Sequence, residues 1–201
     1  MNDDGPGASF GYDAEPGAGV RSRLTVSFGE RLDLDMLVAA STPRGAQALV
    51  VPQDVNLIMG EVRAIEDTRE TAEQVIAAAR TQRPRTRGSI LVAPERTGEP
   101  LLVQAIVYDF EEDPPARQDH VFEALLGAFE EANRRGLMRL ALRPLGTAHA
   151  GLTAEEFFRL LAQVCYSAVE VGTTIGRVQL LLEGRRDLER YEELLREQMG
   201  Q

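Results

Sequence analysis

Apolar and polar positions follow two different periods along the chain, and the two kinds of segment alternate. Alternation every second residue, or a short unbroken apolar run, is typical of a strand. The segment Leu32–Ser41 fits either element, because it alternates at first and then takes a helical spacing. Strands are predicted at Arg23–Phe28, Ala46–Pro52, Gly88–Pro94, Pro100–Phe110, Leu137–Pro144 and Arg177–Glu183.

Apolar residues spaced three and four apart predict the helices. Asp119 is the expected N-cap of the second helix, and Gly136 stands where a helix-ending glycine belongs. Thr153 and Glu156 have the spacing of a capping box at the start of the third helix. The predicted helices are Ile65–Arg83, Asp119–Arg135, Ala154–Val171 and Asp187–Gln198.

Strands that alternate with helices predict an α/β domain with a mixed, largely parallel central sheet. We expect helices on both faces, which gives a three-layer α/β/α sandwich. Residues 1–22 are rich in Gly, Pro, Ala and acidic residues without a period, and we expect a flexible tail followed by one domain over residues 23–201. Ligands of such sheets bind beyond the carboxyl ends of the strands, where the loop Leu145–Leu152 falls.

Composition excludes several classes of function. The net charge of −10 argues against a nucleic-acid surface, and no apolar run is long enough to predict a membrane span. The amino terminus lacks the pattern of a secretory signal, and a single cysteine allows no internal disulfide, so we expect a cytoplasmic protein. All 22 basic residues are arginine, which excludes lysine nucleophiles and Schiff bases.

The stretch "LGTAHAGLT" (Leu145–Thr153) is the candidate binding loop. Its two glycines permit backbone geometry closed to other residues, and the small side chains between them let an anion approach the amides. The amino terminus of the following helix adds partial positive charge. We therefore expect unpaired N–H groups of this loop to converge on a hollow open to solvent. The alternative is a tight strand-to-helix connection that holds no ligand.

From about Leu24 to Leu195 the order of segments resembles a macro domain, the module that binds ADP-ribose. The resemblance is best in the carboxyl half, where "GLMRLALRPLGTAHAGLTAEEFFRLLAQV" is similar to the family's glycine-rich second ligand loop and the capped helix after it. "RGSILVAP" also resembles a strand of the family. The resemblance implies that the diphosphate is surrounded by Gly146, Thr147, Ala148, His149, Ala150 and Gly151.

The amino-terminal half departs from the family's pattern. Glu30 occupies the place of an aspartate that holds the adenine amino group. Val51 and Asp54 stand where two ribose-binding asparagines are expected, and Asn56 is a nearby substitute. Only Gly60 remains of a run of glycines, and Ile58 and Met59 are expected to narrow the cleft. Asp54 is expected to place a negative charge near the diphosphate.

Each of the other reactive residues has a functional and a non-functional interpretation. His149 could donate to an anion or act as an acid or base, or simply face solvent. Cys165 falls on an apolar helix face and is expected to be buried and inert. The acidic stretch Asp109–Asp119 could attract a divalent cation, but its spacing and two prolines favour a solvated connection. We expect no metal site and no cofactor.

Three functions follow. The first is a non-catalytic, macro-like module that binds ADP-ribose or a similar diphosphate through the amides of the Gly146–Gly151 loop. The second is an accessory or interaction domain that binds no ligand, like the amino-terminal domain of leucine aminopeptidases, which is similar to the macro fold. The third is an ADP-ribosyl hydrolase with altered residues. The sequence leaves the oligomeric state open.

Overall fold

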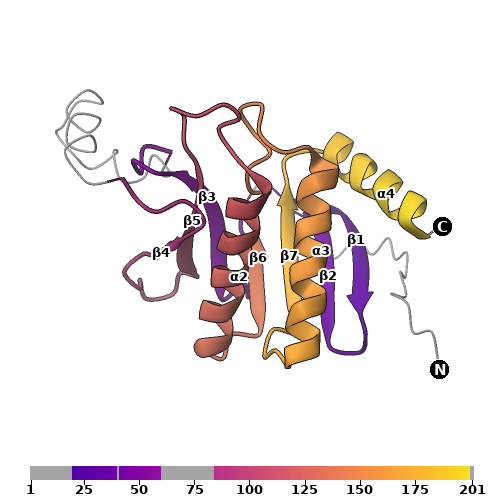
Figure 1. Cartoon of the computed structure of the whole chain (residues 1–201). Coiled ribbons are helices and arrows are strands. Elements are labelled where there is room, and N and C mark those ends of the chain that lie inside the picture. Colours follow the sequence, from indigo (N-terminus) through magenta and orange to yellow (C-terminus); the bar gives the residue numbers. More distant parts are fainter. Residues whose placement is uncertain (1–19, 40, 60–83, 200–201) are drawn as a thin grey trace.

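The computed structural model describes residues 20–39, 41–59 and 84–199, without the side chains of 20–22 and 197–199. Seven strands form one twisted sheet in the order β1-β2-β7-β6-β3-β5-β4 (Figure 1). The five central strands are mutually parallel, and the antiparallel strands β1 and β4 form the two edges. The prediction of an α/β fold with a mixed, largely parallel sheet is confirmed.

Most strands lie where the hydrophobic pattern placed them. The ambiguous segment after the first strand forms a strand, because its alternate residues pack into the core. The first strand begins at Val20, inside the segment expected to be a tail. The strands are β1 (Val20–Phe28), β2 (Leu32–Ala39), β3 (Ala48–Asp54), β4 (Ile90–Val92), β5 (Leu101–Tyr108), β6 (Arg139–Leu142) and β7 (Arg177–Leu182).

Three helices are described: α2 (Gln118–Arg134), α3 (Ala154–Val171) and α4 (Arg185–Met199). The predicted capping box of α3 is confirmed. Asp119 was the wrong choice for the N-cap of α2, because the chain is extended at Arg117 and Asp119 already lies in the first turn. Gly136 ends α2 in the left-handed region, with φ +66°. Among the described helices, none has the length and apolar character to cross a membrane.

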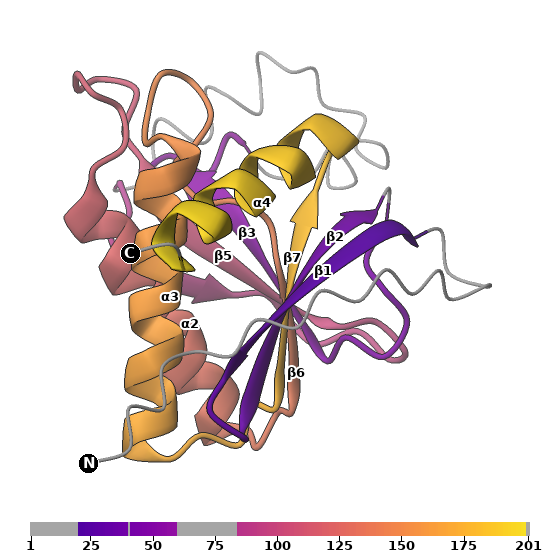
Figure 2. The ribbon, with the colours of Figure 1, turned by 90° about the vertical axis from the view of Figure 1, so that its right-hand side faces the viewer.

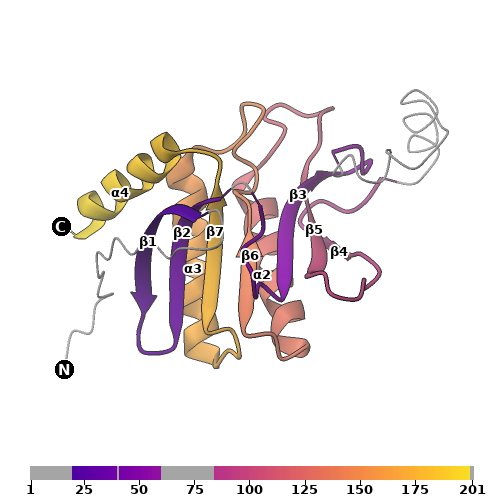
Figure 3. The same cartoon turned by 180° about the vertical axis from the view of Figure 1, so that it is seen from behind.

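The larger core lies between the sheet and the three described helices (Figure 2). Alternate strand residues such as Leu34, Val50 and Leu180 point into it and meet Phe129 and Phe157 from the helices. On the opposite face, none of the described helices covers the strands (Figure 3). The predicted helix Ile65–Arg83, which would belong to a third layer, lies outside the described residues.

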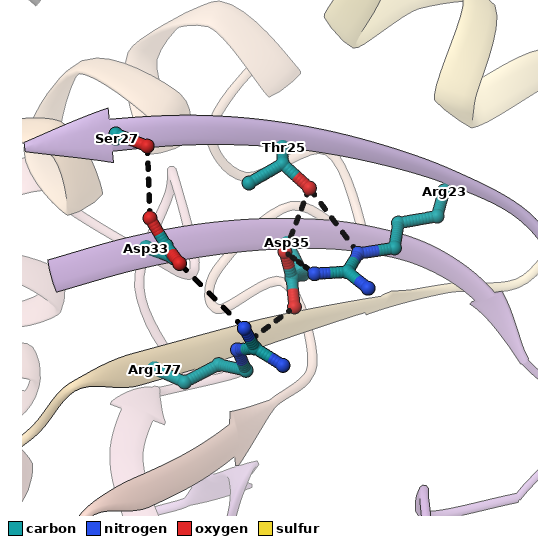
Figure 4. A network of polar contacts seen from close by, with 6 residues as sticks. All are labelled: Arg23, Thr25, Ser27, Asp33, Asp35 and Arg177. Atoms are coloured by element: carbon teal, nitrogen blue, oxygen red, sulfur yellow. Dashed lines mark hydrogen bonds and ion pairs between the residues drawn. The ribbon is translucent and has the colours of Figure 1, made fainter. Parts of the chain in front are cut away.

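That opposite face has an apolar part and a polar part. The apolar part is a small cluster made by Leu37, Leu49, Val51, Ala141 and Leu181. The polar part is a network across β1, β2 and β7, centred on the buried carboxylate of Asp35 (Figure 4). Asp35 accepts hydrogen bonds from Arg23 and Thr25, each at 2.8 Å, and lies 3.5 Å from Arg177. Charged side chains thus satisfy one another on this part of the sheet.

Candidate functional site

A cleft of about 810 Å³ opens at the carboxyl ends of the parallel strands. Pro52 of β3, Tyr108 of β5 and Leu182 of β7 contribute to its wall from the sheet. From the loop after β6 and the start of α3 come Thr147, Ala148, Leu152, Thr153 and Ala154. Strand ends and a helix amino terminus therefore meet in one hollow, as the sequence predicts for this type of sheet.

The charged groups of the cleft have both signs. Arg143 follows β6 and Arg190 lies on α4, while Glu183 and Asp187 line the wall near the start of α4. The Asp187 carboxylate accepts a hydrogen bond from the Gly184 amide, which holds it at the amino end of α4. The cleft can therefore receive an anionic group beside an arginine and a polar group beside a carboxylate.

The predicted binding loop lies beside this cleft, but only Thr147 and Ala148 of Gly146–Gly151 line it. Gly146 has φ +73°, and a Cβ there would lie 2.7 Å from Val121. At Gly151 a Cβ would lie 2.1 Å from the Gly146 carbonyl oxygen. Both glycines are thus required by the packing of the loop itself.

Several amides of the loop are already bonded within the protein, so the expected convergence of free N–H groups is only partly realised. Gly151 donates to the Ala148 carbonyl, and Leu152 donates to the Gly146 carbonyl. The Thr153 amide donates to Glu156, whose pKa is lowered by its hydrogen bonds from the Thr153 amide and hydroxyl. Among the described residues, the amides of Gly146, Thr147, His149 and Ala150 have no partner.

His149 and Ala150 are exposed at the tip of the loop and take left-handed backbone angles, with φ 55° and 58°. Non-glycine residues in this region cost roughly 1 kcal/mol or more each. The His149 ring packs edge-on against Tyr108 and Phe110, at centroid distances of 5.6 and 5.3 Å. His149 thus packs on the aromatic rings behind the loop and does not line the cleft.

Tyr108 is a site residue that the sequence analysis did not identify. It is the last residue of β5, and its hydroxyl oxygen accepts the Ala148 N–H at 2.9 Å. Burial raises the pKa of Tyr108, against the opposing effect of the Ala148 hydrogen bond, so the phenol is neutral at neutral pH. Its place within an apolar strand made it look like an ordinary core residue.

The first loop, after β3, agrees with the expectation only in part. Asp54 is buried, and its carboxylate accepts hydrogen bonds from the amides of Asn56, Ile58 and Met59 at 2.7–2.8 Å. The backbone amides of the loop stabilise the negative charge of Asp54, and Asp54 does not line the cleft. The expectation that Asp54 places an unfavourable charge in the cleft is therefore wrong. Met59 lines the cleft as expected, whereas Ile58 and Asn56 do not.

Two further predicted residues, Glu30 and Gly60, cannot be placed at the cleft. Glu30 lies in the turn between β1 and β2, at the amino ends of the parallel strands and thus at the opposite end of the sheet from the cleft. The resemblance placed Glu30 by its order along the chain, and the hairpin directs it elsewhere. Gly60 lies outside the described residues.

In the described part of the chain, the remaining reactive groups give no second site. Cys165 is buried in α3 as predicted, and burial strongly raises the pKa of its thiol. The acidic stretch after β5 forms ion pairs, for example between Glu112 and Arg87. Across the described ranges, no group of three or more His, Cys, Asp or Glu side chains is arranged to hold a metal ion.

Several solved structures have a fold similar to that of this chain. A macrodomain of Oceanobacillus iheyensis with ADP superposes with a TM-score of 0.65 at 13% identity, covering 89% of this chain and 97% of that chain. The macrodomain of Thermus aquaticus DarG gives 0.54 at 18% identity, covering 74% of this chain and 97% of that chain. A Trypanosoma brucei macrodomain in complex with ADP-ribose gives 0.55 at 12% identity, covering 75% and 63%.

No protein-family model matches the sequence, and no curated protein matches it. At identities this low, similarity in structure establishes the arrangement of the chain. The extent of the superpositions agrees with the resemblance found in the sequence. The chain has the macrodomain fold.

Proposed function

We propose that the cleft binds a nucleotide-derived diphosphate, with ADP-ribose as the first candidate. The observation that carries the proposal is the meeting of Thr147, Ala148 and the first turn of α3 in an open hollow at the carboxyl ends of the strands. Backbone amides and a helix amino terminus are suited to phosphate. Solved structures of this fold with ADP and with ADP-ribose support a nucleotide ligand.

In this proposal the Gly146–Gly151 loop holds the phosphates through its amides, and the arginines that line the cleft add positive charge. The Thr147 amide is the best placed donor, since it has no partner among the described residues and its residue lines the cleft. The role is binding without catalysis. Its support is that His149 does not line the cleft and that Cys165 is buried within α3.

Calorimetric titration with ADP-ribose tests the proposal, together with the variant Ala148→Glu. Ala148 is exposed and lines the cleft, so a glutamate there would repel a diphosphate without disturbing the core. We expect affinity to fall by about 10-fold or more, which corresponds to about 1.4 kcal/mol. Gly146→Asp is unsuitable, because its side chain would collide with Val121 and could disrupt folding.

Gln163→Glu is the matched control, because it adds the same charge at an exposed position of α3 that does not line the cleft. This variant should bind as the unaltered protein does. Absence of heat with the unaltered protein at about 1 mM ADP-ribose, where even a weak site would be half filled, contradicts the proposal.

The second candidate is an accessory domain that binds no nucleotide. It is favoured by the loop amides that the protein already satisfies, those of Ala148, Gly151, Leu152 and Thr153. Under this alternative neither ADP-ribose nor ADP would bind. The third candidate, an ADP-ribosyl hydrolase, requires release of free ADP-ribose from a modified protein, which a chromatographic assay would detect.

A further inference from the structure

The Tyr108 side chain connects the loop to the cleft wall. It belongs to a strand of the sheet, whereas the amide that it binds belongs to the loop 40 residues further along the chain. Both Tyr108 and Ala148 line the cleft. The 2.9 Å contact from the Ala148 N–H to the phenol oxygen therefore lies at the wall of the candidate site.

Neighbouring rings fix the orientation of this phenol. Phe110 stacks nearly parallel to Tyr108, with 5.7 Å between ring centroids and an angle of 7°. His149 packs edge-on against Tyr108 at 82°. Aromatic pairs of this kind attract each other beyond the effect of the apolar area that they bury. The Tyr108 hydroxyl therefore has little freedom to move away from the cleft wall.

The phenol uses only half of its hydrogen-bonding capacity. Its oxygen accepts the Ala148 N–H, but its own proton has no acceptor among the described residues. Tyr108 is buried, and a hydroxyl proton without an acceptor in such a place carries a cost in free energy. A group that accepts a hydrogen bond from the cleft side would remove this cost.

We propose that the Tyr108 hydroxyl is a ligand-binding donor that contacts an anionic oxygen, of the phosphate class, beside the loop. The inference rests on the proposed function and adds one named group to it. Because the phenol already accepts the Ala148 N–H, its O–H is polarised and becomes a stronger donor. Tyr108 would thus link the loop amide to the ligand through two consecutive hydrogen bonds.

The test compares Tyr108→Phe with Tyr166→Phe. Tyr108→Phe keeps the ring and its stacking and removes only the hydroxyl, whereas Tyr166 lies on α3 and does not line the cleft. Hydrogen bonds to charged groups are worth about 1.5–3 kcal/mol, so Tyr108→Phe should weaken ADP-ribose binding by about 10- to 100-fold. Tyr166→Phe should leave the affinity unchanged.

A second readout follows the hydroxyl directly. In protein labelled with ¹³C at the tyrosine ζ carbon, the Tyr108 resonance, assigned from its loss in Tyr108→Phe, should shift on addition of pyrophosphate. Adenosine, which lacks phosphate, should not shift it, and the Tyr166 resonance should stay in place with either compound. This measurement requires no binding of the complete nucleotide.

The outcomes separate the two proposals. If the unaltered protein binds ADP-ribose and Tyr108→Phe binds equally well or more tightly, the inference is overturned and the proposed function stands. Tighter binding would mean that the hydroxyl competes with the ligand for the Ala148 amide. If ADP-ribose does not bind at all, the proposed function fails, and an unmoved Tyr108 resonance with pyrophosphate then overturns the inference as well.

Discussion

At the scale of single residues, the role of the Asp54 carboxylate follows from the backbone N–H groups that donate hydrogen bonds to it. Asp54 is the last residue of β3 and occupies a place where an amide side chain was expected. Its two carboxylate oxygens accept three backbone N–H groups of the next five residues. Leu57, within the same turn, takes φ 60°, which a non-glycine residue adopts only when its surroundings impose it. The carboxylate is thus what holds the first loop in its shape.

Replacing Asp54 by alanine should therefore destabilise the protein markedly. The substitution leaves three loop amides without their acceptor, and we expect a loss of about 2–4 kcal/mol in the free energy of unfolding. Urea denaturation measures this loss. The Asn56 side chain makes no hydrogen bond among the described residues. Asn56→Ala should therefore lower the free energy of unfolding by under about 0.5 kcal/mol. Equal effects of the two changes would show that the carboxylate has no special role.

At the scale of elements, the polar network joins three strands on a part of the sheet where no described helix packs. Asp35 is 1% exposed and contacts two arginines, while the neighbouring Asp33 is 38% exposed and contacts one of them at 3.6 Å. The two aspartates lie on the same strand and the same face. They differ mainly in burial, so they form a matched pair for experiment.

Asp35→Ala should lower the free energy of unfolding by about 2–3 kcal/mol, because it leaves Arg23, Arg177 and Thr25 without their shared acceptor. Asp33→Ala should cost about 1 kcal/mol or less, as is usual for an exposed pair. Chemical denaturation of both variants checks the difference. A cost of Asp35→Ala no larger than that of Asp33→Ala would contradict a central role for Asp35.

The carboxyl end of α2 provides a pH-dependent contact. Glu131 binds Arg134 and Arg135, and these hydrogen bonds lower its pKa from the ordinary 4.5 to about 2. Because the folded protein holds this carboxylate ionised, its contribution is complete above pH 4.5 and is lost as the pH falls toward 2. The contact also pairs the last turn of the helix with cations, which its dipole favours.

We therefore expect Glu131→Gln to destabilise the protein by about 1 kcal/mol at neutral pH, allowing for solvent screening. The difference from the unaltered protein should shrink between pH 4.5 and about 2. Thermal unfolding across this range measures it. Glu130→Gln, which changes an exposed neighbour, is the control. A difference that stays constant with pH would contradict the ionised contact.

At the scale of the whole molecule, local patterns predicted the elements well, and long-range placement was harder to infer. The capping box at Thr153 and the helix-ending Gly136 were identified correctly, because both depend on a few consecutive residues. Glu30 was assigned to the site by its order in the chain, yet the β1–β2 hairpin puts it at the far end of the sheet. The role of Tyr108 depends on a loop 40 residues away, which no local pattern encodes.

The crowding at Gly146 and Gly151 has an evolutionary consequence. Each glycine is demanded by neighbouring atoms of the protein, so natural selection for a folded chain would preserve both even in a lineage that had lost its ligand. Thr147 and Ala148 border the hollow, so a bound ligand would constrain their side chains. Conservation or change of Thr147 and Ala148 among related sequences is therefore more informative about past ligand binding than conservation of the two glycines.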